Sequence, residues 1–259
     1  MINEKIDGGK EFDWGFTSEK YAKYRDIYPE ALYNRLRELG VAADGTAWLD
    51  LGTGTGVLPQ NLYNEKAEIF GVDISENQIA FAKMNAEKNG RKINYTVSPA
   101  ENTRLPDGSF DCITAAQCFS YFDRDGIKSE IRRLLKPGGR FIKIYMDWCS
   151  DDEICKNSIE SVKRYNKSWT AGTDIYKDLN DDLFDGRVTE SFYCDIPFTR
   201  ESWHGRMCAC RGTLASMSKE QFERWSEAHM KMLEEYPESF TIKHKVYISY
   251  FTVEKKHDV

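Results

Sequence analysis

Apolar runs of strand length alternate with helix-length segments between residues 46 and 146, and this alternation most limits the possible folds. Strands that alternate with helices form βαβ units, which place the strands parallel in one sheet. The chain therefore predicts an α/β fold. The expected strands of the parallel core are 46–51, 68–73, 93–98, 110–116 and 140–146.

Capping residues and helix breakers place the helices around these strands. Ser75 and Gln78 form a capping box that predicts a helix start, as Ser218 and Gln221 do later. Lys136-Pro-Gly-Gly139 is expected to break the helix before the fifth strand. The other expected helices are 18–28, the segment from Pro29 to Gly40, and 151–166.

Two further strands are predicted after the parallel core, at 188–197 and 242–253. Two strands that follow a five-stranded core predict a seven-stranded mixed sheet with an antiparallel last strand and helices on both faces. The chain is interpreted as one domain over residues 1–259. Within it, 1–40 would form a helical cap and 147–235 a partly helical insertion on the acceptor side.

Charge and composition exclude several classes of function. The formal net charge is -6, whereas proteins that bind phosphate backbones are usually basic, so nucleic acid is disfavoured as a partner. No apolar run reaches the roughly 18 residues of a membrane span, and the first residues lack a signal-peptide core. The 7 cysteines form no CxxC pair, which favours reduced thiols and a cytoplasmic location.

The segment LDLGTGTGVL (49–58) places a glycine loop directly after the first strand. A Walker loop would need Gly-Lys-Ser/Thr, but Val57 follows Gly56, and the same valine breaks the dinucleotide pattern GxGxxG. The remaining pattern is acid-x-GxGxG, from Asp50 to Gly56, with a second acid, Asp73, at the end of the next strand. A carboxylate in that place can accept both hydroxyls of a ribose.

With these motifs the chain resembles the class I S-adenosylmethionine-dependent methyltransferases, within the group called methyltransferase type 11. Four stretches carry the resemblance over residues 20–146: LDLGTGTG, GVDIS (71–75), PAENTRLPDGSFDCI (99–113) and LLKPGGRFI (134–142). The resemblance implies a Rossmann-like fold and S-adenosyl-L-methionine as cofactor. The cofactor-binding residues that it implies, together with the first acid, are Asp50, Gly52, Thr53, Gly54, Gly56, Asp73, Ile74, Ala100, Glu101 and Gln117.

The resemblance also implies a role for each part of this set. The loop glycines and Thr53 would contact the methionine portion, Asp73 the ribose, Glu101 the adenine amino group, and Gln117 the reactive end. Structural readings stay open at three positions. Asp50 could only end a strand, Glu101 could be a surface acid, and Gln117 could be a polar residue at a strand end.

Methyl transfer from a sulfonium is an in-line displacement that needs positioning more than covalent catalysis, so no catalytic base is identified. The acceptor is expected to contact the N-terminal aromatic residues around Tyr21, the end of the fifth strand, and segment 199–217 with His204 and Arg206. That segment could instead be a helix packed on the sheet. His204, Cys208 and Cys210 match no zinc spacing, so no metal is expected.

The sequence therefore predicts an S-adenosylmethionine-dependent methyltransferase that acts on a small soluble molecule without membrane or nucleic-acid partners. Two alternatives stay open. One is a methyltransferase for RNA or protein, and the other is a module that binds the cofactor without turnover.

Overall fold

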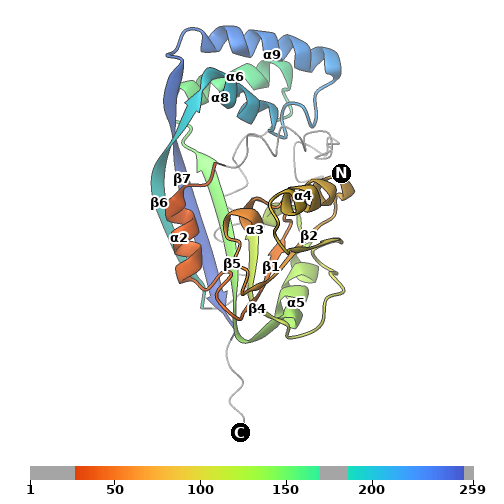
Figure 1. The fold of residues 1–259 in the computed structure, drawn as a ribbon. Coiled ribbons are helices and arrows are strands. Elements are labelled where there is room, and N and C mark those ends of the chain that lie inside the picture. Colours follow the sequence, from red (N-terminus) through yellow and green to blue (C-terminus); the bar gives the residue numbers. More distant parts are fainter. Residues whose placement is uncertain (1–26, 170–185, 254–259) are drawn as a thin grey trace. The chain divides into compact units, whose positions relative to one another are not determined.

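The computed structural model describes residues 27–169 and 186–253, and these form two compact units (Figure 1). The described part of the first, here called the loop unit, comprises residues 28–146, 186–192 and 246–253. That of the second, the helical unit, comprises Ile27 and residues 147–169 and 193–245. The helix expected at 18–28 lies almost wholly outside the described residues.

The strands of the described chain are β1 (Ala47–Leu51), β2 (Glu68–Asp73), β3 (Asn94–Val97), β4 (Phe110–Ala116), β5 (Leu135–Trp148), β6 (Val188–Thr199) and β7 (Ser239–Thr252). The α-helices are α2 (Glu30–Glu38), α3 (Val57–Asn61), α4 (Glu76–Lys88), α5 (Arg124–Leu134), α6 (Glu153–Tyr165), α8 (Arg200–Cys208) and α9 (Lys219–Leu233). A 3-10 turn, Phe119–Tyr121, follows β4.

The strands form one seven-stranded sheet in the order β3-β2-β1-β4-β5-β7-β6. The first five pair in parallel, with Leu49 opposite both Phe70 and Ile113. At the other end β7 runs antiparallel to β5, and Gly138 N–H donates to the Val253 carbonyl at 2.9 Å. The predicted mixed sheet is therefore confirmed.

The fifth strand begins earlier than the sequence suggests. Lys136-Pro-Gly-Gly139 is predicted to separate helix from strand, but β5 starts at Leu135, directly after α5. The register with β4 shifts between Phe110 and Cys112, so the Pro-Gly-Gly stretch is accommodated as an irregularity of the ladder. Pro can stand there because a bulge does not require its missing N–H.

Helices cover both faces of the sheet in the loop unit. Phe70 packs against the cluster that contains Ile127, Ile131 and Leu134 of α5. The neighbouring Gly71 faces the ring of Tyr95, which packs with α4. Because successive residues of a strand point to opposite faces, α4 and α5 lie on opposite sides. Full burial of each aliphatic α5 side chain contributes about 1.5–3 kcal/mol.

The helical unit is built from α6, α8 and α9, which pack on the ends of long strands (Figure 1). Trp203 and Trp225 are fully buried in its core. The capping box predicted at α9 is present, because the Ser218 and Gln221 side chains each bond the other's backbone N–H. None of the described helices combines the length and apolar character that crossing a bilayer requires.

Candidate cofactor site

The loop between β1 and α3 makes turns that favour glycine. Gly52 and Gly56 have φ of 62° and 81°, a left-handed backbone that side chains rarely adopt. A Cβ on Gly52 would lie 2.7 Å from Cys118 Sγ, and one on Gly56 would lie 2.3 Å from Tyr95 Oη. The loop therefore needs glycine for its conformation and for its close approach to neighbouring side chains.

Asp73, the last residue of β2, holds this loop through its carboxylate. Oδ2 accepts a hydrogen bond from Gly54 N–H at 2.9 Å, and Oδ1 accepts one from Ser75 N–H at 2.9 Å. Burial raises the pKa of Asp73, and the backbone donors only partly offset that rise. Gly54 and Ser75 occupy one acceptor position on each oxygen, and a carboxylate has about four such positions in all. Asp73 can therefore bind the loop and a ligand together.

Asp50 lies beneath the loop in a buried polar chain. Its Oδ1 accepts a hydrogen bond from Thr114 Oγ1 at 2.6 Å, and Thr114 in turn accepts one from Trp48 Nε1 at 2.9 Å. Burial raises the pKa of Asp50 to about 7, although the bond from Thr114 opposes the rise. Asp50 is only 3% exposed, and this chain fixes the end of β1.

The raised pKa of Asp50 predicts that the free energy of unfolding contains a term that falls as pH rises. The folded protein keeps this proton up to pH near 7, whereas an unfolded Asp releases it near pH 4. Between those values the term falls by up to about 1.4 kcal/mol per pH unit. The side chain of the Asp50→Asn variant cannot ionise. The free energy of unfolding of this variant minus that of the wild type should therefore rise across pH 4–7, as measured by urea unfolding.

The matched control for this measurement is Asp44→Asn, because Asp44 forms an exposed ion pair with Lys66 and has a lowered pKa. Its difference from wild type should stay flat above pH 5. A difference for Asp50→Asn that is constant or falls with pH would show that the carboxyl is ionised in the folded protein.

The residues implied for the adenine side lie at the ends of β2 and β3. Ile74 is 59% exposed although it is apolar, and Ala100 is buried. Glu101 uses Oε1 to accept a hydrogen bond from Asp123 N–H at 2.8 Å, at the residue that caps α5. An exposed isoleucine next to Asp73 offers an apolar surface to a flat ring.

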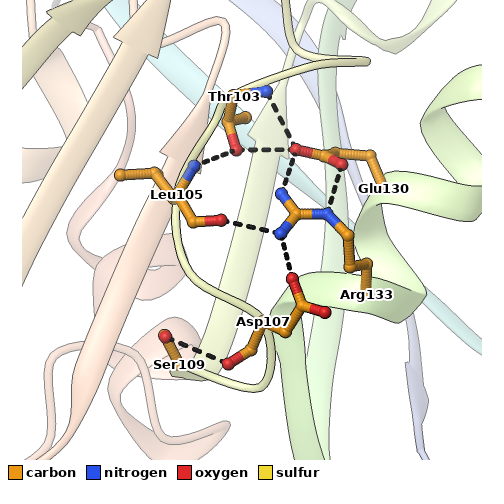
Figure 2. A network of polar contacts seen from close by, with 6 residues as sticks. All are labelled: Thr103, Leu105, Asp107, Ser109, Glu130 and Arg133. Atoms are coloured by element: carbon orange, nitrogen blue, oxygen red, sulfur yellow. Dashed lines mark hydrogen bonds and ion pairs between the residues drawn. The ribbon is translucent and has the colours of Figure 1, made fainter.

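A polar network anchors the 99–109 segment, which carries Glu101, onto α5. Figure 2 shows Glu130 at its centre, with Oε1 accepting from the Thr103 N–H and hydroxyl at 2.8 and 2.7 Å. Arg133 donates to both carboxylate oxygens and also bonds Leu105 O and Asp107. Burial alone would raise the pKa of Glu130, but the bonds from Arg133 and Thr103 outweigh it and lower the pKa.

This network predicts a clear loss of stability for Glu130→Ala. The change leaves buried donors of Thr103 unsatisfied, so the free energy of unfolding should fall by about 2 kcal/mol at pH 7. Because the folded pKa is depressed, the penalty is full above the unfolded pKa of about 4.3 and shrinks as pH falls below it. Asp107→Ala is the control, since Asp107 binds the same Arg133 with a side chain that is 79% exposed. Asp107→Ala should lower the free energy of unfolding by less than about 0.5 kcal/mol. Chemical denaturation of both variants measures the two losses.

Gln117 follows β4 and has a strained backbone. Its φ is 61°, which is uncommon for a residue other than glycine. Its N–H donates to Ile144 O at 2.9 Å, and its side-chain Nε2 donates to Met146 O. Such strain occurs at functional sites, where the surrounding structure maintains it. The next residue, Cys118, donates to Leu51 O at 3.2 Å, and burial raises its pKa well above the usual range.

Comparison with known proteins agrees with this geometry. A family model described as a methyltransferase domain matches residues 49–143, which contain β1 to most of β5. Residues 49–143 are therefore similar to a methyltransferase domain. The class I methyltransferase resemblance is confirmed by this match and by named relatives.

Two curated relatives show how far the similarity to this domain extends. A demethylmenaquinone methyltransferase from Thermus thermophilus is 37% identical over 97 residues, covering 36% of this chain and 44% of the relative. A ubiquinone biosynthesis O-methyltransferase from Aromatoleum aromaticum is 27% identical over 129 residues, covering 49% and 54%. The chain thus spans about half the length of the curated relatives that it matches.

Among solved structures, a putative type II methyltransferase from Anaeromyxobacter dehalogenans superposes with a TM-score of 0.62. It is 23% identical, and the alignment covers 88% of this chain and 97% of that one. The shared fold therefore extends beyond residues 49–143, and it supports the predicted Rossmann-like architecture.

Of the predicted acceptor residues, His204 and Arg206 both lie in α8 and contact different neighbours. Tyr21 lies outside the described residues. His204 Nδ1 is 2.8 Å from His229 Nδ1, and its ring stacks on Trp225 with centroids 5.4 Å apart, so it faces α9. Arg206 is buried and lies over the Trp148 ring, 4.8 Å from its centroid.

The cysteines show no arrangement for metal binding or disulfide formation. All seven are free, and Cys208 and Cys210 are buried in the core of the helical unit. In the described ranges no cluster of three or more His, Cys, Asp or Glu side chains could hold a metal ion.

Sequence reasoning missed two residues that shape the candidate cofactor site. Thr114 lies in the middle of β4 and positions Asp50, and Tyr95 lies in β3 and fills the space beside Gly56 and Gly71. A polar residue inside the buried run of β4 was the available signal for Thr114. For Tyr95 no local pattern separates it from an ordinary core residue.

Proposed function

We propose that this chain is an S-adenosyl-L-methionine-dependent methyltransferase that acts on a small soluble molecule. The observation that carries the proposal is the bond from Gly54 N–H to Asp73 Oδ2, which joins the glycine loop to the acid at the end of β2. This arrangement suits a ligand with a ribose and a charged amino-acid tail. The Asp73 carboxylate offers acceptors for the ribose hydroxyls, and the glycine loop lets the backbone approach the tail closely.

The residues present fit this cofactor. Backbone at Gly52 and Gly56 approaches neighbouring side chains where a Cβ could not, which is the property a close-fitting ligand loop requires. Gly52, Thr53, Gly54 and Gly56 would contact the methionine portion, and Asp73 the ribose. The adenine would be bounded by the side chains of Ile74, Ala100 and Glu101.

The bound cofactor supplies a methyl group already activated by a sulfonium charge. The protein therefore needs to bind, orient and exclude water rather than form a covalent intermediate. Asp50 and Thr114 support the loop from beneath. Gln117, which follows β4, is held by the backbone carbonyls of Ile144 and Met146 in β5. These contacts restrict motion of the elements that would align the donor.

A small-molecule acceptor agrees with the charge of the chain. The net charge of -6 is unfavourable for binding RNA, and the relatives are named for quinone-biosynthesis reactions. A cytoplasmic location is part of the same proposal, based on cysteines that form no CxxC pair.

Isothermal titration with S-adenosylhomocysteine, NAD and ATP tests the proposed cofactor. We expect S-adenosylhomocysteine to bind at micromolar concentration and the other two at least about 100-fold more weakly. Preferential binding of NAD would replace the proposal with a dinucleotide-binding function. Mass spectrometry of a metabolite extract incubated with methyl-labelled cofactor then tests turnover, and binding without label transfer would favour a non-catalytic module.

A further inference from the structure

Two buried carboxyl groups of the loop unit lie on the same face of the sheet, at the glycine loop. Asp50 of β1 is paired with Gly71 of β2, and Asp73 lies two positions beyond Gly71. Because alternate residues of a strand share a face, Asp50 and Asp73 point to the same side of the sheet. The loop follows Asp50 directly and binds Asp73 through Gly54 N–H. Both acids therefore serve one loop.

The donors that bind these carboxyl groups carry no charge. Asp50 accepts from the Thr114 hydroxyl at 2.6 Å, and Asp73 accepts from two backbone N–H groups at 2.9 Å each. Burial raises the pKa of Asp50 to about 7, and the negative charge of Asp73 adds to the rise, whereas Thr114 opposes it. The folded chain by itself therefore keeps Asp50 protonated below neutral pH.

Two other acidic groups near Asp50 stay neutral at physiological pH. Tyr95 lies in β3, and Cys118 follows β4. Burial and then the charge of Asp50 raise the pKa of the Tyr95 hydroxyl and that of the Cys118 thiol. The positive charge of Arg91 also acts on Tyr95, but less strongly than Asp50 does. Between pH 5 and 7 the proton that can leave this group of side chains therefore belongs to one of the two aspartates.

A positive charge on a ligand would favour the ionised form of Asp50. An opposite charge within about 4–6 Å lowers the pKa of a carboxylic acid by about 1–3. In S-adenosylmethionine the ammonium and carboxylate of the tail compensate each other, so the sulfonium is the uncompensated charge. S-adenosylhomocysteine has the same tail, ribose and adenine but no sulfonium. The two ligands therefore present the buried acids with charges that differ by one.

We propose that Asp50 releases a proton when S-adenosylmethionine binds and regains it when the product is S-adenosylhomocysteine, so that this acid favours the methyl donor over its product. The proposal rests on the cofactor function proposed above. On binding, the O–H bond of the Asp50 carboxyl breaks, the electron pair stays on the carboxylate oxygen, and the proton passes to solvent. Once methyl transfer has removed the positive charge, Asp50 takes a proton back from solvent.

Isothermal titration of the wild-type protein with the two ligands across pH 5–7 tests this proposal. The ratio of their affinities is measured, because the contributions of the shared tail, ribose and adenine cancel in it. The preference for S-adenosylmethionine should rise at least about fivefold from pH 5 to pH 7, the effect of a fall of about one in the pKa of Asp50. The α-amino groups of both ligands stay largely protonated in this range. A constant ratio would overturn the proposal.

The released proton is counted by the same titration in two buffers that differ in their enthalpy of ionisation. At pH 6, binding of S-adenosylmethionine should release roughly 0.4–0.8 of a proton more than binding of S-adenosylhomocysteine does. Equal release for the two ligands contradicts the proposal. Both measurements use the wild-type protein, so they decide the question even where a variant fails to fold.

Two variants assign the proton to one of the two aspartates. The side chain of Asp50→Asn cannot ionise, so the affinity ratio of this variant should not change with pH. Asp73→Asn removes a charge that raises the pKa of Asp50, so the rise of the ratio should persist and move to lower pH. A rise that persists in Asp50→Asn, or one that is lost in folded Asp73→Asn, would show that Asp50 is not the group that exchanges the proton.

The matched control is Asp111→Asn, which changes a carboxylate of β4 at the other end of β1. Asp111 accepts a hydrogen bond from Ala47 N–H at 2.9 Å and pairs with Lys136 at 2.7 Å. Burial acts against its ionisation, but Lys136 and Ala47 outweigh burial and lower the pKa of Asp111. This carboxylate is already charged across pH 5–7, so the affinity ratio of Asp111→Asn should follow that of the wild type.

Failure of this inference and failure of the proposed function give different results. Should neither ligand bind at any pH, the cofactor function is wrong and the inference is wrong with it. Should both bind with an affinity ratio that does not depend on pH, the cofactor function stands and only the role of Asp50 is wrong.

Discussion

Replacing Asp73 by Ala should lower the affinity for S-adenosylhomocysteine by roughly 30- to 1,000-fold. The change removes the two acceptors expected for the ribose hydroxyls, which together contribute about 2–4 kcal/mol to binding. This free energy converts to the expected loss of affinity at about 1.4 kcal/mol per tenfold change. It also removes the bonds from Gly54 and Ser75 that hold the loop, so the loss should lie toward the upper end. Isothermal titration measures it directly.

Two variants make this result specific. Asp44→Ala removes an exposed carboxylate that pairs with Lys66, and its cofactor affinity should stay within about twofold of wild type. Asp73→Asn keeps one acceptor oxygen and should fall between wild type and Asp73→Ala. An unchanged affinity in folded Asp73→Ala would remove this residue from the site.

Replacing Gly71 by Ala should lower the free energy of unfolding by about 2–4 kcal/mol. The new Cβ would lie 2.7 Å from Cδ1 and Cε1 of Tyr95 and 3.0 Å from Cγ2 of Thr53. Tyr95 is 5% exposed and paired with Gly71 across the sheet, so its ring has little room to move. The backbone of Gly71 is ordinary for a strand, which leaves steric overlap as the cause.

A double-mutant cycle separates this cause from a general intolerance of the strand. In a Tyr95→Ala background the space beside Gly71 is open, and Gly71→Ala should cost less than about 1 kcal/mol. The free energies come from urea unfolding of the four proteins. Equal costs in both backgrounds would show that the ring is not what excludes a side chain at this position.

Features set by neighbouring residues were readable from the sequence. The bounds of β2 and β4 match the predicted strands, because their apolar runs end at residues that suit strand ends. The capping box at Ser218 starts α9 as expected, since both bonds form within one turn. The spacing of the glycines and Asp73 predicted the similarity to methyltransferases for the same reason, because a loop conformation depends on its own residues.

One local pattern misled because a distant strand competed with it. Lys136-Pro-Gly-Gly139 is a helix breaker by composition, yet Gly138 and Gly139 pair with Val253 at the other end of the chain. The backbone bonds gained in the sheet extend β5 back to Leu135. The box predicted at Ser75 is half formed, because its Gln78 is buried and Ser75 alone caps the helix.

Features that join distant residues were decided only by the tertiary structure. Thr114 reaches Asp50 because the register of β4 on β1 places them opposite each other, and 64 positions separate them in the chain. Tyr95 lies beside Gly71 through the pairing of β3 with β2. The sequence by itself determined the strands, the glycine loop and the acid at its side, because local sterics and capping suffice for them. The partners of the buried polar groups depend on strand register and helix packing, which are properties of the whole folded chain.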